Sequence, residues 1–340
     1  MSVLTGFEKR DSNHLMELIK PDVVRVEAAM RFDIDSLTDQ HDQLLMEVLR
    51  YGLFNGGKRF RPLLATVAAR LCGETGPDIY RLAMAFEYLH MATLFHDDVI
   101  DNADTRRGRP AVNKAYGMVA AILAGDFLHA RSMAIIGECG GIEALKIFCL
   151  ATSGMVDGEF LQLRNTTNFN QSEEDYFTAI TGKTALLIAA TTEIGSLAAG
   201  GKSMERQALR RYGSNLGCAF QMIDDLLDYL GDPNTTGKPV GNDLAEGKMT
   251  LPLILAMNRA ELQDRQHLLA ILQNSDLRRK SLTEVTGIIL KYNGFTDTKT
   301  KAEEMIREAI SPLEIFSRSD QGRDRMILAG LAQYVLTRKK

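Results

Sequence analysis

Cysteine is scarce in this 340-residue chain, and its four copies lie far apart. Cys72, Cys139, Cys149 and Cys218 form no Cys-x-x-Cys pair, so their spacing indicates neither a disulfide framework nor a zinc site. Such cysteine usage fits a reducing compartment. We therefore expect a cytoplasmic protein.

An excess of positive charge is also missing. The 44 acidic and 40 basic side chains give a net charge of -4, whereas nucleic-acid-binding domains are usually basic. No apolar run reaches the roughly 20 residues of a membrane span, and the N-terminus shows no apolar core after a basic start. We expect neither a nucleic-acid partner nor a membrane anchor. With 45% hydrophobic residues, the chain can bury a large core.

Strand signals are missing as well. Apolar residues recur at three- and four-residue spacing over residues 21–53 and 79–101, which predicts helices. Only eight prolines occur, and neither a long linker nor a tandem repeat interrupts the pattern. We expect an all-α fold in a single domain over residues 1–340.

Two aspartate clusters stand out, in "HDDVIDNADTRRGRP" (96–110) and "FQMIDDLLDYLGD" (220–232). Helix residues four apart share a face, so Asp97 and Asp101, like Asp224 and Asp228, should project carboxylates in one direction. Hard cations such as Mg²⁺ prefer these oxygen ligands. A solvated acidic face is the alternative, but large apolar residues precede both clusters.

Two other functions are less well supported by the sequence. His96-Asp97 could belong to a helical metal-dependent phosphohydrolase, which would need further histidine ligands, and none lies beside the second cluster in the sequence. The "GKT" of "TGKTA" is typical of a nucleotide P-loop, yet the first glycine and the preceding strand are missing. We reject the P-loop.

Seven successive motifs resemble those of the trans-isoprenyl diphosphate synthases, or polyprenyl synthetases, from about residue 20 to the end. They are "GGKRFRP", "LHMATLFHDDVIDNADTRRGRPAVN", "GDFLHARS", "GEFLQL", "TGKTALL", "FQMIDDLLDYLGD" and "GKPVGNDLAEGKMTLPLI". The resemblance implies a single helical bundle with a central active-site cavity. It also implies a Mg²⁺-dependent prenyltransferase that joins an allylic diphosphate to isopentenyl diphosphate, giving an all-trans polyprenyl diphosphate.

The resemblance also assigns residues to the allylic diphosphate. About three Mg²⁺ ions would bridge it, held by Asp97, Asp98, Asp101, Asp224 and Asp228. Arg106, Lys183 and Lys238 would contact the same diphosphate. Thr184 and Gln221 would line the path of the allylic cation, where dipoles stabilise positive charge. The expected catalytic set is Asp97, Asp101, Asp224, Lys183, Thr184 and Gln221.

Isopentenyl diphosphate would bind on the metal-free side, at Lys58, Arg61, His90 and Arg107. One diphosphate must leave while the other stays intact, which gives a reason for metal on only one of them. Ala92 and Thr93 lie about one turn before Asp97. Members with short products commonly carry an aromatic residue there, so we expect hexaprenyl to decaprenyl products, with octaprenyl favoured.

Two further functions stay open at this point. A non-catalytic partner subunit would keep the fold but typically loses aspartates or basic contacts, and this chain has both. A terpene cyclase would share the metal chemistry but would have no use for "GGKRFRP". The resemblance further implies a homodimer, and the apolar product suggests transient membrane contact at release.

Overall fold

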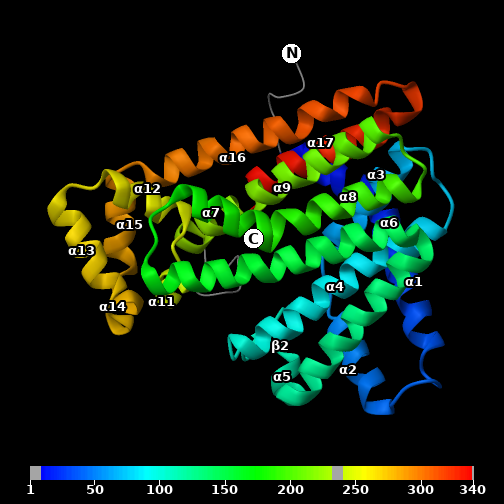
Figure 1. Cartoon of the computed structure of the whole chain (residues 1–340), viewed down its shortest axis with the longest axis horizontal. Coiled ribbons are helices and arrows are strands. Elements are labelled where there is room, and N and C mark those ends of the chain that lie inside the picture. The colour runs from blue at the N-terminus through cyan, green and yellow to red at the C-terminus, as the bar shows by residue number, and fades with distance from the viewer. Residues whose placement is uncertain (1–8, 232–239, 339–340) are drawn as a thin grey trace. The chain divides into compact units, whose positions relative to one another are not determined.

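The chain folds almost entirely into helices, as its periodicity predicts. The computed structural model describes residues 9–231 and 240–338 (Figure 1). Within these ranges, the strands are β1 (Thr105–Arg106) and β2 (Arg109–Pro110), an antiparallel pair after the first aspartate motif. The all-α prediction is confirmed.

The chain divides into two units, each built from three stretches of sequence. Unit 1 comprises residues 1–149, 190–210 and 315–330. Unit 2 comprises residues 150–189, 211–314 and 331–340. Five helices contain residues of both units: α6 (Met118–Asn168), α8 (Leu186–Ala198), α9 (Ser203–Leu230), the 3-10 helix η2 (Ser311–Ile315) and α17 (Gly322–Thr337).

Unit 1 is organised around α4, on which α1 and α3 both pack. Its own helices are α1 (Lys9–Ser36), α2 (Gln43–Leu53), α3 (Phe60–Leu71), α4 (Asp78–Ile100), α5 (Val112–Ala115) and the 3-10 helix η3 (Ser319–Gln321). The predicted helix over 79–101 matches α4 closely. The helical segment over 21–53 is two helices instead: α1 ends at Ser36, and Asp42 begins α2 by accepting from the backbone amides of Leu44 and Leu45.

Unit 2 contains α12, on which α15 and α16 pack. Its own helices are α7 (Glu173–Ile180), the π-helix η1 (Thr181–Ala185), α11 (Asn242–Glu246), α12 (Leu251–Arg259), α13 (Leu262–Leu272), α14 (Ser275–Lys280), α15 (Leu282–Lys291) and α16 (Gly294–Ile310). Ser172 caps α7 by accepting from the amide of Asp175, and acidic residues fill the first turn.

The long helix α6 carries many exposed apolar side chains. α6 runs for 51 residues and is interrupted at Gly141, whose φ of 74° is non-helical. Phe160 and Leu163 are exposed by 67% and 64%, and Leu150 by 71%. In the first half, Met118, Val119 and Leu123 are exposed by 59% to 69%. In each unit, these apolar side chains of α6 are exposed among the described residues.

Candidate active site

The first aspartate motif lies at the C-terminal end of α4, in unit 1. Asp97 is half-buried in the last turn, and the exposed Asp101 is the C-cap residue, with its amide 2.8 Å from the Asp97 carbonyl oxygen. The C-terminus of a helix carries partial negative charge, so carboxylates are unfavourable there. A cation bound by Asp97 and Asp101 would offset this repulsion.

Asp98 lies on a different face and has a partner within the chain. Its carboxylate is buried and accepts from Arg106 Nε at 2.9 and 3.1 Å, and Arg106 Nη2 also donates to it. Asn113 donates to the Asp98 carbonyl oxygen at 2.8 Å. A bidentate guanidinium on a buried carboxylate is a strong, oriented contact. Asp98 therefore fixes Arg106 beside the motif.

Arginines surround His90 in the same unit. The pKa of His90 is well below its usual value, because of burial and then the positive charges of Arg61, Arg107, Arg106 and Arg59. A neutral imidazole beside several guanidinium groups is a local excess of positive charge. Such a group of residues suits an anionic ligand.

Arg59 and Arg107 differ in what they contact. Arg59 is buried and donates to Glu87 at 2.8 Å and to Glu27 at 3.2 Å, so its charge is compensated inside the unit. Arg107 is exposed and contacts the carbonyl oxygen of Gly56. Burial and the neighbouring arginines lower the pKa of Arg107. Arg107 and the exposed Lys58 are thus placed where an anion could reach them.

The second aspartate motif lies within α9, in unit 2. Burial, followed by the charge of Asp225, raises the pKa of the half-buried Asp224, whereas Arg338 lowers it. Burial and the charge of Asp243 raise the pKa of Asp228 to about 6. Asp228 also accepts from the backbone amides of Asn242 and Asp243 at 3.2 and 3.0 Å. Ionising either carboxylate therefore costs free energy, and a bound cation would reduce that cost.

Arg338 binds one of these carboxylates, that of Asp224. Its Nη2 donates to Asp224 Oδ1 at 2.6 Å and to the Phe220 carbonyl oxygen at 2.8 Å, and its guanidinium lies 3.8 Å from the Phe220 ring centroid. The Arg338 side chain is only 6% exposed. Arg338 therefore neutralises Asp224 in this structure.

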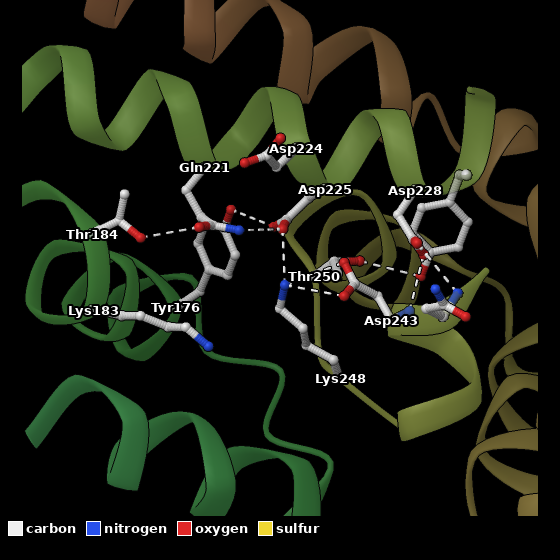
Figure 2. A network of polar contacts seen from close by, with 12 residues as sticks. Tyr176, Lys183, Thr184, Gln221, Asp224, Asp225, Asp228, Asp243, Lys248 and Thr250 are labelled. Atoms are coloured by element: carbon white, nitrogen blue, oxygen red, sulfur yellow. Dashed lines mark hydrogen bonds and ion pairs between the residues drawn. The ribbon is translucent and has the colours of Figure 1, made fainter. Parts of the chain in front are cut away.

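A polar network joins Asp225 to its surroundings (Figure 2). The fully buried Asp225 accepts from Tyr176 Oη at 2.7 Å, Gln221 Nε2 at 3.0 Å and Lys248 Nζ at 3.2 Å. Lys248 also donates to both oxygens of Asp243 at 3.2 Å. The charges of Asp225 and Asp243 raise the pKa of Lys248 against the opposing effect of burial, so the ammonium form is stable.

The "TGKTA" segment forms the π-helix η1, which continues α7. Thr184 Oγ1 donates to Gln221 Oε1 at 3.0 Å, and Lys183 Nζ lies 2.6 Å from Glu159 Oε2. The structure therefore brings together Thr184 and Gln221, two residues expected to line one path. A π-helical segment within an α-helix often marks a functional site.

Glycines allow this segment to approach α6 closely. A Cβ built on Gly158 would lie 2.3 Å from the backbone nitrogen of Lys183, and one on Gly182 would lie 2.7 Å from the Gly154 carbonyl oxygen. No side chain fits at either position. The two glycines thus set the distance between η1 and α6.

The carboxylates fit a magnesium site of a particular kind. Over residues 9–231 and 240–338, no three His, Cys, Asp or Glu side chains are gathered closely enough to hold a metal by themselves. Mg²⁺ typically takes one or two carboxylates and completes its shell with water and substrate phosphate. Asp97 with Asp101, and Asp224 with Asp228, could provide the carboxylate part of such sites.

The remaining expected residues lie as follows. Ala92 is buried on α4, and the Thr93 hydroxyl donates to the His90 carbonyl oxygen at 2.8 Å. Lys238 lies outside the described residues. His96 Nε2 lies 3.2 Å from the Ile122 carbonyl oxygen and 3.4 Å from Asp126, so it has partners other than the motif aspartates.

Sequence reasoning missed three residues of unit 2: Tyr176, Lys248 and Arg338. Lys248 stands in the motif "GKPVGNDLAEGKMTLPLI" and could have been noticed there. Tyr176 and Arg338 have no local signal, because their partners lie 49 and 114 positions away in the sequence.

Comparison with known proteins identifies the family. The sequence model of the polyprenyl synthetase family matches residues 42–289. The chain is a member of the polyprenyl synthetase family. The octaprenyl diphosphate synthase of Escherichia coli (strain K12) is 36% identical over 324 residues, covering 95% of this chain and 98% of that relative.

Other polyprenyl synthetases show similar agreement. The short chain isoprenyl diphosphate synthase of Methanothermobacter thermautotrophicus is 36% identical over 309 residues, or 90% of this chain and 94% of the relative. A polyprenyl synthase from Caulobacter crescentus CB15, crystallised with calcium and isoprenyl diphosphate, superposes with a TM-score of 0.87 at 34% identity. The match covers 96% of this chain and 98% of that one.

The polyprenyl synthetase has no helix that could span a bilayer among the residues that the structure describes.

Proposed function

We propose that this polyprenyl synthetase condenses an allylic diphosphate with isopentenyl diphosphate and gives an all-trans polyprenyl diphosphate. The observation that carries the proposal is the arrangement of two Asp-Asp-x-x-Asp motifs in a chain of this family. In each motif the first and last aspartates share one side of a helix, and the second is bound by a cation of the chain. Each helix thus presents a pair of carboxylates suited to a divalent cation.

Metal binding is proposed for Asp97, Asp101, Asp224 and Asp228, with about three Mg²⁺ ions on the allylic diphosphate. When bound, the ions neutralise the charge of the leaving group. Asp98 is proposed to act on the metal site through Arg106. A guanidinium has five N–H donors, so Arg106 can contact a diphosphate with the donors that Asp98 does not use.

The other cations are proposed to bind the two diphosphates. Lys183 would exchange Glu159 for the allylic diphosphate, and Lys238 is assigned to the same group by the family resemblance. Isopentenyl diphosphate is assigned to the arginine-rich surroundings of His90, with the following contacts: Lys58, Arg61, His90 and Arg107. The lowered pKa values of His90 and Arg107 support an anion there, because an anion would relieve the repulsion between the cations.

Thr184 and Gln221 are proposed to line the path of the allylic cation. Both side chains contribute oxygen dipoles without a strong nucleophile, so they can stabilise positive charge and form no covalent adduct. Released pyrophosphate is the proposed proton acceptor.

Family membership does not settle the product length, because relatives of equal identity differ in the products that their names give. We propose hexaprenyl to decaprenyl products, with octaprenyl favoured, since Ala92 and Thr93 place no large side chain one turn before Asp97. Ala92→Phe should therefore shorten the chromatographically determined product. Ala83→Phe, also at a buried alanine of α4, controls for general damage, and an unchanged product from Ala92→Phe would contradict the assignment.

The experiment that tests the function is incubation with Mg²⁺, farnesyl diphosphate and labelled isopentenyl diphosphate, followed by chromatography of the dephosphorylated products. Chains of thirty to fifty carbons are the expected result. Asp97→Ala and Asp224→Ala should each lose at least about a hundredfold in kcat with an intact circular dichroism spectrum. Folded protein that makes no product with the metal present would refute the function.

The assembly is proposed to be a homodimer formed through α6, in a cytoplasmic protein with one functional domain over residues 1–340. The exposed Phe160 and Leu163 lie beside a groove of about 1290 Å³ between α6, α7 and η1, which also includes Phe177 and Leu186. A second copy would remove these apolar side chains from water. Transient membrane contact is proposed for release of the apolar product.

A further inference from the structure

Asp225 is the best connected polar group in the part of unit 2 shown in Figure 2. It has no exposed surface, and its two oxygens accept from Tyr176, Gln221 and Lys248. A buried carboxylate without such donors would be costly. The network therefore keeps Asp225 in one place, one helical turn after Gln221 on α9.

This arrangement decides which way the Gln221 amide points. A carboxylate can only accept hydrogen bonds, so the group of Gln221 that faces Asp225 must be its NH₂. The reverse orientation would put two acceptor oxygens about 3 Å apart. Gln221 Oε1 consequently points to Thr184, whose hydroxyl donates to it at 3.0 Å.

The orientation has an electrostatic consequence at Thr184. Because the Thr184 proton is used on Gln221, the two oxygen atoms of this pair have only lone pairs left for a further contact. A flipped amide would instead direct N–H groups towards Thr184 and release the Thr184 proton to point elsewhere. Lone pairs stabilise a nearby cation, whereas N–H and O–H dipoles of that orientation repel it.

We propose that Asp225 is a positioning residue for the allylic cation: it fixes the Gln221 amide so that Gln221 and Thr184 present oxygen to the cation. Tyr176 and Lys248 hold Asp225 in the orientation that this requires. The inference rests on the proposed function, since it concerns the cation path at Thr184 and Gln221. It assigns to the second aspartate of the motif a role that differs from metal binding.

A double-mutant cycle with two unreactive ligands tests the inference. The first ligand is an ammonium analogue of the allylic cation, bound with pyrophosphate and Mg²⁺. The second is a thiolodiphosphate analogue that is uncharged at the same carbon. The measured quantity is the ratio of their Kd values, because a general loss of folding or of metal binding weakens both ligands and leaves the ratio unchanged.

Asp225→Asn, whose amide can also donate, should weaken the ammonium analogue about tenfold relative to the thiolodiphosphate analogue. In a Gln221→Met background the same substitution should change the ratio less than about twofold. An equal effect in both backgrounds would mean that Asp225 acts by its charge alone and would overturn the inference. So would an unchanged ratio in the native background.

Tyr176→Phe provides a second test, because it removes one donor to Asp225 and preserves the charge of Asp225. It should shift the ratio in the same direction by a smaller factor. Tyr229→Phe is the matched control, because Tyr229 is equally buried on α9 and its hydroxyl contacts Thr250 at 3.2 Å instead of Asp225. A Tyr229→Phe effect as large as that of Tyr176→Phe would contradict the inference. Turnover by native protein with no ratio change in any variant would refute the inference while the synthase function stands.

Discussion

The second aspartate of each motif is bound by a cation that the chain itself supplies. Arg106 contacts Asp98 within unit 1, and Lys248 contacts Asp225 within unit 2. The first aspartate of each motif precedes the second by one residue and therefore points about 100° away from it on a helix. Asp224 is also bound by a cation, Arg338, but its side chain is half-exposed whereas those of Asp98 and Asp225 are buried.

Asp228 gives a pH-dependent prediction for metal-free protein. Its folded-state pKa is about 6, above the unfolded value of about 3.9. Folded Asp228 thus keeps its proton to higher pH, and stability falls as pH rises from about 4 to 6. Asp228→Asn should raise the urea midpoint at pH 7.5 by more than at pH 4.5. The gain should be below ~1.4 kcal/mol, since solvent screens this half-exposed group. An equal gain at both pH values would contradict the pKa assignment.

Arg338 gives a prediction about metal affinity. Its guanidinium holds Asp224 at 2.6 Å, so it competes with any cation that uses this carboxylate. Arg338→Gln should tighten Mn²⁺ binding at least about threefold, measured by electron paramagnetic resonance without substrate. Arg323→Gln, at an exposed arginine of α17, the helix that precedes Arg338, controls for net charge. If Mn²⁺ affinity in Arg338→Gln is unchanged or lower than in native protein, Arg338 does not compete with the metal.

At the scale of elements, the close approach of α6 and η1 has a simple steric origin. Gly158 and Gly182 leave no room for a Cβ on either side. The proximity places Lys183 within reach of Glu159, and it also fixes the backbone from which Thr184 projects. The position of Thr184 at the proposed cation path thus depends on glycine at both 158 and 182.

Gly158→Ala should therefore displace η1. We expect a loss of about 1–3 kcal/mol in the free energy of unfolding, as for other overpacked sites, together with reduced turnover. Gly287→Ala is the matched control: Gly287 lies in α15 with open space around its Cβ position, so alanine should be neutral or stabilising by about 0.5–1 kcal/mol. Equal stability of the two variants would show that the contact between α6 and η1 tolerates a methyl group at position 158.

Helix periodicity predicted α4 and the all-α class, and helical spacing predicted which aspartates share a face. It did not predict the break between α1 and α2, since the apolar pattern continues across it, whereas α1 ends at Ser36 and Asp42 begins a new helix by capping α2. Nor did it predict that Arg106 would bind Asp98 or that Arg338 would bind Asp224. Those pairings depend on tertiary packing, which local spacing does not encode.

At the scale of the whole molecule, the apolar surface of α6 bears on the oligomeric state. Phe160→Glu should weaken a homodimer at least about tenfold in sedimentation equilibrium, because it places a charge in an apolar contact. Leu290→Glu is the control, because Leu290 is 65% exposed and belongs to α15, a different helix. A native monomer, or a dimer equally affected by both variants, would contradict assembly through α6.

The π-helix η1 also changes the phase of the helix that contains it. Tyr176 and Thr184 are eight residues apart, so in an uninterrupted α-helix they would point about 80° apart. A π-turn holds about one extra residue, equal to about 100° of rotation, and so brings the two directions nearly into line. Tyr176 and Thr184 accordingly both reach α9, at Asp225 and Gln221. If η1 became regular α-helix at unchanged sequence, Thr184 would turn about 100° away from its present direction, although every side chain of the network would be the same.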